Sequence, residues 1–223
     1  MTLDEQLRAA LPSLGLPDER CGPNRGSQLH VADRELYRWI LRSFAAGHVP
    51  SIGDVALAAR EGGVDDVEHA LGAMVEHDLI QRTDSGEIGC AYPFSTNPTN
   101  HVVTLDNGLR LYAMCAVDAL GIPSMLRTSA LITTTDPITG ARIAITVDSD
   151  GAARSAPTAA VVLCAVAAGP GPLSAICCPL VNTYESEVTA SAFLAAHAEL
   201  QGPILTIPDA VACGDMVFGG VLG

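Results

Sequence analysis

The sequence predicts an α+β protein, in which an N-terminal winged helix-turn-helix-like module packs on a mixed-sheet domain with flanking helices. Three helical patterns and a hairpin pattern occupy residues 31–90. Short β-type segments between Gly and Pro turns follow in residues 91–223, where runs of strands replace strict strand–helix alternation. Residues 1–30, rich in Pro and Gly, are expected to form a helix and loop arm.

The proposed module begins with apolar residues at helical spacing. A first helix is expected from Asp33 to the Gly47 stop, and Ser51 is expected to cap a second helix with Asp54 at the capping-box position. A third helix is expected over residues 64–77. Residues 79–83 and 87–90 then predict a hairpin.

The third helix would be the recognition helix of a winged helix-turn-helix, yet its charges are acidic. It carries Asp65, Asp66, Glu68 and Glu76 and no Arg. A helix in the major groove needs positive or neutral polar side chains beside the phosphates. We therefore expect a packing module rather than a DNA-binding one.

The second part of the chain predicts a helix over residues 109–120, ending near Gly121 and Pro123, after a strand at 101–105 and an Asp-Asn-Gly turn. Further strands are expected at residues 129–135, 141–147, 159–165 and 173–181. Two more helices are expected at 190–200 and 207–217.

Composition excludes several classes of protein. The formal net charge is -13, so nucleic acid and anionic membranes are not expected as partners. All twelve basic residues are Arg, and without Lys there is neither a Schiff base nor a Walker A loop. No apolar run is long enough to span a bilayer, and the acidic start is unlike a signal peptide, so a cytoplasmic protein is expected.

The seven Cys residues, an odd number in a chain expected to be cytoplasmic, argue against a disulfide framework. Spacing for a zinc finger is also missing. For Cys164 and Cys90 we expect structural roles. Cys21 has no chemical residues around it, and Cys213 is a candidate surface thiol for shuttling metal.

The strongest chemical signal is the segment 112–118, Tyr-Ala-Met-Cys-Ala-Val-Asp, together with the distant doublet Cys177-Cys178. In a helix, Cys115 and Asp118 share one face. Two thiolates beside a carboxylate suit a soft metal such as mercury. In a strand the two thiols of the doublet would point to opposite faces, so one would face the site and the other the core. Taken singly, Cys115 also fits a buried apolar position and Asp118 an exposed helix face.

These residues carry a resemblance to a known family. Residues 111–123 (Leu-Tyr-Ala-Met-Cys-Ala-Val-Asp-Ala-Leu-Gly-Ile-Pro), followed by Arg127-Thr128, resemble the signature of the organomercurial (alkylmercury) lyases. Ile176-Cys-Cys followed by Val181-Asn-Thr resembles the family's second catalytic segment. The resemblance covers about residues 30–220 and implies a catalytic domain of the alkylmercury lyase type over residues 91–223.

Carried over by position, the resemblance implies Cys115, Asp118 and Cys177 as catalytic residues and as ligands of the metal. The chain departs from the family in three places. Met114 replaces a Trp, a structural Cys is missing near Thr133, and the C-terminal segment matches loosely. These departures bear on substrate range and leave the three site residues in place.

The implied reaction is protonolysis of a carbon–mercury bond, giving a hydrocarbon and Hg(II). Two thiolates would bind mercury, and Asp118 would take a thiol proton and deliver it to carbon. No organic cofactor is implied, only reducing thiols. Small-molecule thiols, or a mercuric reductase as a candidate partner, would remove Hg(II).

Two alternatives of other classes remain open. A non-catalytic or diverged soft-metal protein, binding mercury or copper on the same fold, would use the same thiols but release no hydrocarbon. A winged-helix regulator that senses metal would bind DNA at low salt, which the acidic third helix opposes.

Overall fold

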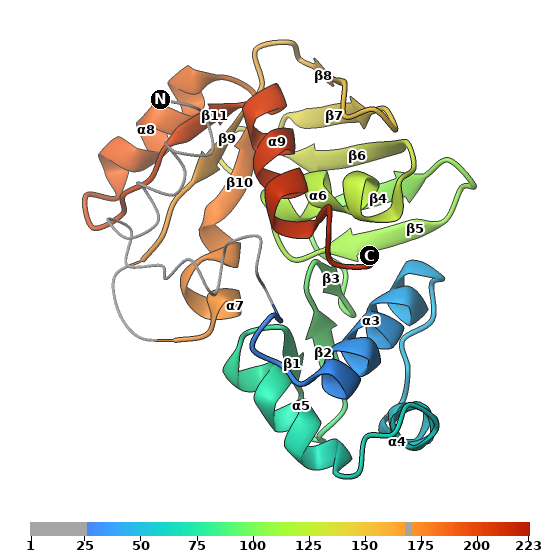
Figure 1. Ribbon diagram of the computed structural model, residues 1–223. Coiled ribbons are helices and arrows are strands. Elements are labelled where there is room, and N and C mark those ends of the chain that lie inside the picture. The colour runs from blue at the N-terminus through green and yellow to red at the C-terminus, as the bar shows by residue number, and fades with distance from the viewer. Residues whose placement is uncertain (1–25, 168–170) are drawn as a thin grey trace.

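The computed structural model describes residues 26–167 and 171–223, and it confirms the α+β class (Figure 1). Most of the arm expected at residues 1–30, including Cys21, lies outside the described residues. Within the described ranges, none of the helices is long and apolar enough to cross a membrane.

The N-terminal helices follow the sequence prediction closely. They are α3 (Val31–Ala45), α4 (Ile52–Glu61) and α5 (Val67–Glu76). The capping box of α4 is confirmed, because the Ser51 hydroxyl accepts from Asp54 N at 3.2 Å and Ser51 N donates to Asp54 Oδ2 at 2.9 Å. Helix α5 begins three residues later than expected, because the Asp66 side chain caps it by accepting from His69 N.

One large sheet spans both parts of the chain. Its strand order is β1-β2-β3-β5-β4-β6-β7-β8, and every pairing in it is antiparallel. The strands are β1 (Ile80–Arg82), β2 (Ile88–Ala91), β3 (Phe94–Ser95), β4 (Val102–Leu105), β5 (Arg110–Ala113), β6 (Ala130–Thr135), β7 (Arg142–Val147) and β8 (Ala153–Ala156). The predicted boundary at residue 90 falls inside β2, so the hairpin of the proposed module continues the sheet of the second part.

The prediction of a mixed sheet was wrong. Strands β4 and β5, β6 and β7, and β7 and β8 are joined by short turns that contain Gly108, Gly140 and Gly151, each at positive φ. Such turns form β-hairpins, in which the next strand runs back along the previous one, so the two strands pair antiparallel.

A second sheet of three antiparallel strands has the order β10-β9-β11. Strands β9 (Val161–Cys164), β10 (Val181–Tyr184) and β11 (Ile204–Thr206) form it. Helix α8 (Glu187–Ala196) lies beside this sheet, and the C-terminal helix α9 (Ile207–Phe218) passes in front of the large one (Figure 1).

The helix expected over residues 109–120 was partly wrong. Residues Arg110–Ala113 form β5, which pairs with β4 across the Asp106-Asn107-Gly108 turn, and α6 begins only at Ala116 and ends at Leu126. The hydrogen bonds of the hairpin take the backbone groups of residues 110–112 that a helix would have used. Cys115, in an extended conformation, separates the strand from the helix.

Helices α6 and α9 pack so closely that glycine is required on both. A Cβ on Gly121 would lie 2.5 Å from Phe218 Cδ2 and 2.8 Å from Gly214 O. The contact holds α6, whose N-cap is Cys115 and whose first turn carries Asp118, against the C-terminal helix.

Substitution of Gly121 by alanine is expected to lower the free energy of unfolding by about 3 kcal/mol, because the methyl group forces the two helices apart. Gly72→Ala, in α5, is the matched control, since a Cβ there meets nothing within 4 Å. That control is expected to raise stability by about 0.5–1 kcal/mol through helix propensity. Urea denaturation of both variants measures the difference, and equal stability of the two would contradict this view of the helix contact.

Candidate active site

The first part of the site lies where β5 gives way to α6. Cys115 is the N-cap of α6, and its Sγ accepts a hydrogen bond from Asp118 N at 3.4 Å. Sulfur here takes the place of the oxygen that usually caps a helix. The backbone before it is held by Ala113 N donating to His101 O and Met114 N donating to Pro93 O, both at 3.0 Å.

Asp118 follows in the first turn of α6. Its side chain is buried at 5% exposure, as is that of Cys115. A carboxylate in the first turn faces the positive end of the helix dipole. The three-residue spacing therefore does bring the thiol and the carboxylate together, although through an N-cap rather than through a shared mid-helix face.

The second part of the site is helical, and the strand expected over residues 173–181 was wrong. Residues Leu173–Ile176 form the short helix α7, Cys178–Leu180 form a 3₁₀ turn, and β10 starts only at Val181. Pro172 is the N-cap of α7, and Pro179 lies in the first turn of the 3₁₀ helix. Pro179 has no N–H for a strand ladder, whereas the first turn of a helix needs none there.

The fold brings three of these side chains into one group. One donor atom each from Cys115, Asp118 and Cys178 lies within 4.8 Å of the other two. Cys178 is buried at 6% exposure, whereas Cys177 is half-buried and outside the group. The sequence had favoured Cys177 as the second thiol. In a helical turn, consecutive residues differ in direction by about 100°, so the alternation argument for a strand does not apply.

Burial raises the pKa of the Cys115 thiol well above its ordinary value. A hydrogen bond with Cys178 and the nearby Asp118 carboxyl raise that pKa further, with smaller contributions from the Cys178 and Cys177 thiols. Cys115 is therefore a neutral thiol at neutral pH. Because a thiol loses its proton when it binds a soft metal, the site must have a group that takes this proton.

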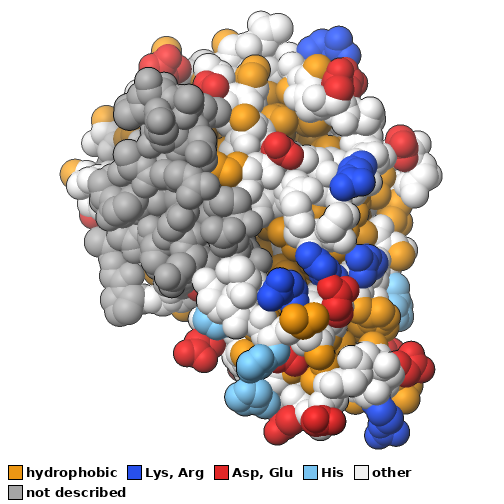
Figure 2. All heavy atoms as spheres, viewed as in Figure 1, with side chains coloured by type: hydrophobic (Ala, Val, Ile, Leu, Met, Phe, Trp, Pro, Cys, Tyr) orange, Lys and Arg blue, Asp and Glu red, His pale blue; other side chains and the backbone are white. Residues whose placement is uncertain are grey.

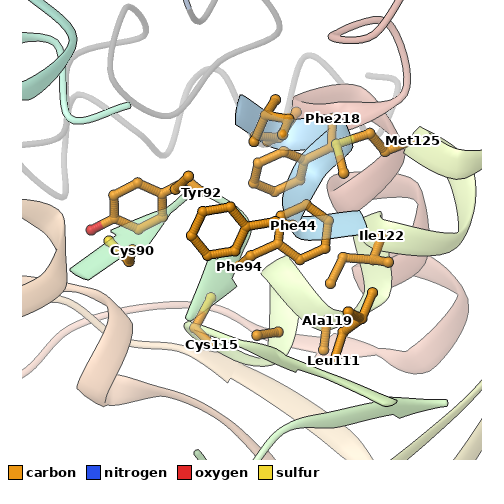
Figure 3. Close-up of a cluster of buried hydrophobic side chains, with 14 of the residues drawn as sticks. Phe44, Cys90, Tyr92, Phe94, Leu111, Cys115, Ala119, Ile122, Met125 and Phe218 are labelled. Carbon is orange, nitrogen blue, oxygen red and sulfur yellow. The ribbon is translucent and has the colours of Figure 1, made fainter. Parts of the chain in front are cut away.

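Apolar side chains surround the group. Figure 3 shows Cys115 at the margin of a buried cluster that includes Phe94, Leu111, Ala119 and Ile122. Phe94 stacks on Phe44 of α3, with ring centroids 5.9 Å apart. This surface excludes water and is compatible with a small hydrocarbon group beside the thiols.

The other described thiols lie outside this group. Cys90 is buried in β2. Burial, and to a smaller extent Cys213, raises the pKa of the Cys164 thiol well above its ordinary value. Cys213 lies in α9 and is half-buried. None of the three belongs to the cluster of donor atoms around Cys115.

Sequence analysis missed two residues near the doublet. The Tyr92 hydroxyl lies 3.9 Å from Cys178 Sγ, and Asp78 Oδ1 accepts from Leu173 N at 3.2 Å. Neither residue lies near a Cys of the site along the chain, so no local pattern marks them.

The alkylmercury lyase family model matches residues 94–219, more than half of the chain, and the match includes both Cys115 and Cys178. The chain belongs to the alkylmercury lyase family. It is an organomercurial lyase, an enzyme that cleaves carbon–mercury bonds.

Curated relatives agree over most of their length. The alkylmercury lyase of Streptomyces lividans is 28% identical over 182 residues, which is 80% of each chain. That of Staphylococcus epidermidis is 27% identical over 179 residues, covering 80% of this chain and 79% of the relative. The Bacillus cereus enzyme is 26% identical over 182 residues, covering 82% and 80%.

A solved structure supports the fold. The mercury-bound form of MerB2 superposes with a TM-score of 0.75 over 99% of this chain and 98% of that one, at 21% identity. The likeness extends over both parts of the chain, including the N-terminal helices.

A buried histidine, His101, lies directly before β4, the strand that pairs with β5. Desolvation lowers the pKa of His101 to about 4, although a hydrogen bond with Asn182 opposes the shift. Its Nδ1 lies 3.4 Å from Thr134 Oγ1. The folded protein therefore holds this imidazole neutral at pH values where an unfolded chain protonates it.

The free energy of unfolding is expected to fall as the pH falls from about 6.5 to about 4, because only the unfolded state binds a proton at residue 101 in that range. The expected loss is about 3 kcal/mol, from about 1.4 kcal/mol per pKa unit. Urea denaturation at each pH measures it. In His101→Gln, most of this difference in the free energy of unfolding between pH 6.5 and pH 4 should disappear. His69→Gln, at an exposed position, is the control and should keep the difference. An unchanged slope in His101→Gln would contradict the assignment.

Proposed function

We propose that Cys115 and Cys178 are the two mercury-binding thiols of this lyase and that Asp118 moves the proton. The observation that carries this assignment is the buried group in which donor atoms of all three residues lie within 4.8 Å. Two thiols and a carboxylate form a soft ligand set with one hard proton acceptor. Cys177, which the sequence favoured, is the competing assignment for the second thiol.

Capture of the substrate is the first step. An organomercury–thiol adduct exchanges its small thiol for Cys115, which loses its proton as the mercury–sulfur bond forms. Asp118, whose backbone N–H is hydrogen-bonded to Cys115 Sγ, is placed to accept that proton. The raised pKa of Cys115 makes this transfer necessary at neutral pH.

Cleavage of the carbon–mercury bond follows. Cys178 gives its proton to the displaced small thiolate, which leaves as a thiol, and adds to mercury as the second sulfur ligand, which weakens the bond to carbon. The proton held at Asp118 is delivered to the carbon, and the electron pair of the carbon–mercury bond forms the new C–H bond. The products are a hydrocarbon and Hg(II) held by two thiolates, so no electron is gained or lost overall.

Release of Hg(II) needs other thiols. Two external thiols take Hg(II) and return the protons to Cys115 and Cys178. We propose small-molecule thiols for this role, with a mercuric reductase as a further acceptor. The two thiols and the carboxylate supply the whole reaction, so we propose no organic cofactor. A reducing compartment such as the cytoplasm keeps the thiols free.

We further propose that helices α3, α4 and α5 with the β1–β2 hairpin form a winged helix-turn-helix-like module that packs on the catalytic part and does not read DNA. In support, an ion pair joins α5 to the hairpin within this module: Arg82 Nη1 of β1 lies 2.6 Å from Glu68 Oε2 of α5. Helices α4 and α5 form the lower end of the molecule, and Figure 2 shows acidic and His side chains there with few positive ones. Retardation of DNA at low salt would contradict this proposal.

The test of the function is hydrocarbon release. Reduced protein is mixed with phenylmercury and excess thiol, and benzene and Hg(II) are quantified. Multiple turnovers are expected. Tight mercury binding without benzene would instead identify a soft-metal binding protein on the same fold.

A further inference from the structure

We infer that Tyr92 and Asp78 are positioning residues that hold the Cys178 thiol in place for the reaction. Both belong to the N-terminal half of the chain, and each contacts a different end of the segment 173–178. The inference rests on the proposed role of Cys178, and it gives the N-terminal half of the chain a function in this site.

Tyr92 contacts the thiol itself. The Cys178 thiol donates to the Tyr92 hydroxyl oxygen, with Sγ and Oη 3.9 Å apart, and both side chains are buried. The backbone of Tyr92 is fixed on both sides. Its N–H donates to Leu79 O at 3.0 Å, and its carbonyl accepts from the Tyr37 hydroxyl of α3 at 2.9 Å. The phenol oxygen therefore has a defined position beside the sulfur.

Asp78 anchors the other end of the segment. Its Oδ1 accepts from Leu173 N, the first residue of α7, at 3.2 Å, and from Gln81 Nε2 at 3.1 Å. Pro172, the N-cap of α7, makes no side-chain cap hydrogen bond. Asp78 thus satisfies one of the backbone donors that a short helix leaves open at its start. Figure 1 shows α7 above α5 and β1, the two elements that flank Asp78 along the chain.

The hydroxyl has a chemical consequence as well as a steric one. While Cys178 is a thiol, it donates to Tyr92. Once that proton has left, the sulfur is only an acceptor, and the Tyr92 O–H turns to donate to it. A hydrogen bond to a charged acceptor is stronger than one to a neutral acceptor. The hydroxyl therefore keeps its contact with the sulfur both before and after the thiol proton has left.

Tyr92→Phe keeps the ring and removes the hydroxyl. We expect kcat for benzene release to fall about tenfold with KM changed less than about twofold, because the lost interaction forms during the reaction. In a Cys177→Ser background, the rate of Cys178 alkylation at one fixed pH, followed by mass spectrometry, should differ about threefold or more between proteins with and without Tyr92→Phe, because this substitution removes the hydroxyl that holds the sulfur.

Tyr184→Phe is the matched control. Tyr184 is also fully buried, and its hydroxyl has no hydrogen-bond partner among the described residues. Tyr184→Phe should leave both kcat and the rate of Cys178 alkylation unchanged. Circular dichroism melting of both variants checks the fold.

The role of Asp78 is tested with two substitutions, to Asn and to Gly, because both of these residues adopt the backbone conformation that Asp78 has. Asp78 has φ +53°, a conformation open to Asn and Gly. Asp78→Asn keeps an oxygen acceptor for Leu173 N and should retain turnover within about threefold, whereas Asp78→Gly should lower kcat about tenfold. Equal activity of these two variants would overturn the role of Asp78.

The inference is overturned if Tyr92→Phe keeps the wild-type kcat and the wild-type rate of Cys178 alkylation. The alkylation experiment needs no turnover, so it separates this result from failure of the proposed function. Wild-type protein without benzene release would remove the reaction, whereas a changed rate of Cys178 alkylation in Tyr92→Phe would still establish the Tyr92 contact.

Discussion

Cys178→Ser is expected to lower benzene release about a thousandfold or more, whereas Cys177→Ser retains most of the activity. Serine has nearly the shape of cysteine, but its hydroxyl is a hard, weak ligand for mercury. With only Cys115 left, the carbon–mercury bond has one sulfur ligand and lacks the second that weakens it. Loss of a group that bonds to the reacting centre has effects of this size in other enzymes.

The doublet supplies its own control, since the two substitutions are chemically identical and one residue apart. Cys178 lies in the buried group with Cys115 and Asp118, and Cys177 does not. Turnover measured with phenylmercury and excess thiol separates the two variants. The reverse result, with Cys177→Ser inactive and Cys178→Ser active, would restore the assignment that the sequence favoured.

Asp118→Asn is expected still to bind phenylmercury, although more weakly than the wild type because Cys115 loses its proton acceptor, and to release benzene about a hundredfold to ten-thousandfold more slowly. The amide keeps the size of the carboxyl group but can neither take a proton from Cys115 nor deliver one to carbon. Binding is measured by equilibrium dialysis of phenylmercury, and cleavage by benzene formed in a single turnover.

Asp215→Asn is the control for a carboxylate outside the site. Asp215 lies in α9, where it accepts a hydrogen bond from the Ser124 hydroxyl of α6. It should change benzene release little. Wild-type cleavage in Asp118→Asn would show that another group supplies the proton.

Much of the fold was predictable because it depends on neighbouring residues. Ser51 and Asp54 lie within one helical turn of each other, so their capping box could be predicted from two letters. The Asp106-Asn107-Gly108 turn between β4 and β5 depends in the same way on a glycine, since Gly108 has φ +84°. The strands β6, β7 and β9 and the helix α9 also follow local patterns.

The errors have a common cause. Residues 109–113 have apolar spacing compatible with a helix, and residues 173–181 have a composition compatible with a strand. Residues 110–113 form a strand because β5 pairs with β4 and β3. Residues 173–180 form helical turns because Pro172 and Pro179 favour a helix start and because Asp78 anchors the first residue of α7. In both places, contacts with distant residues or special backbone chemistry outweighed a short apolar pattern.

By itself, the sequence determined the chemistry of this protein and half of its site. It contains the thiols and the carboxylate, and the three-residue spacing of Cys115 and Asp118 brings them together because a helix begins between them. The tertiary structure alone brought Cys178, rather than Cys177, into one group with these two residues, and it placed Tyr92 and Asp78 in contact with the segment 173–178. The physical reason is that the direction of the Cys178 side chain depends on a helical turn held by the N-terminal half of the chain, and such long-range contacts leave no trace in local spacing.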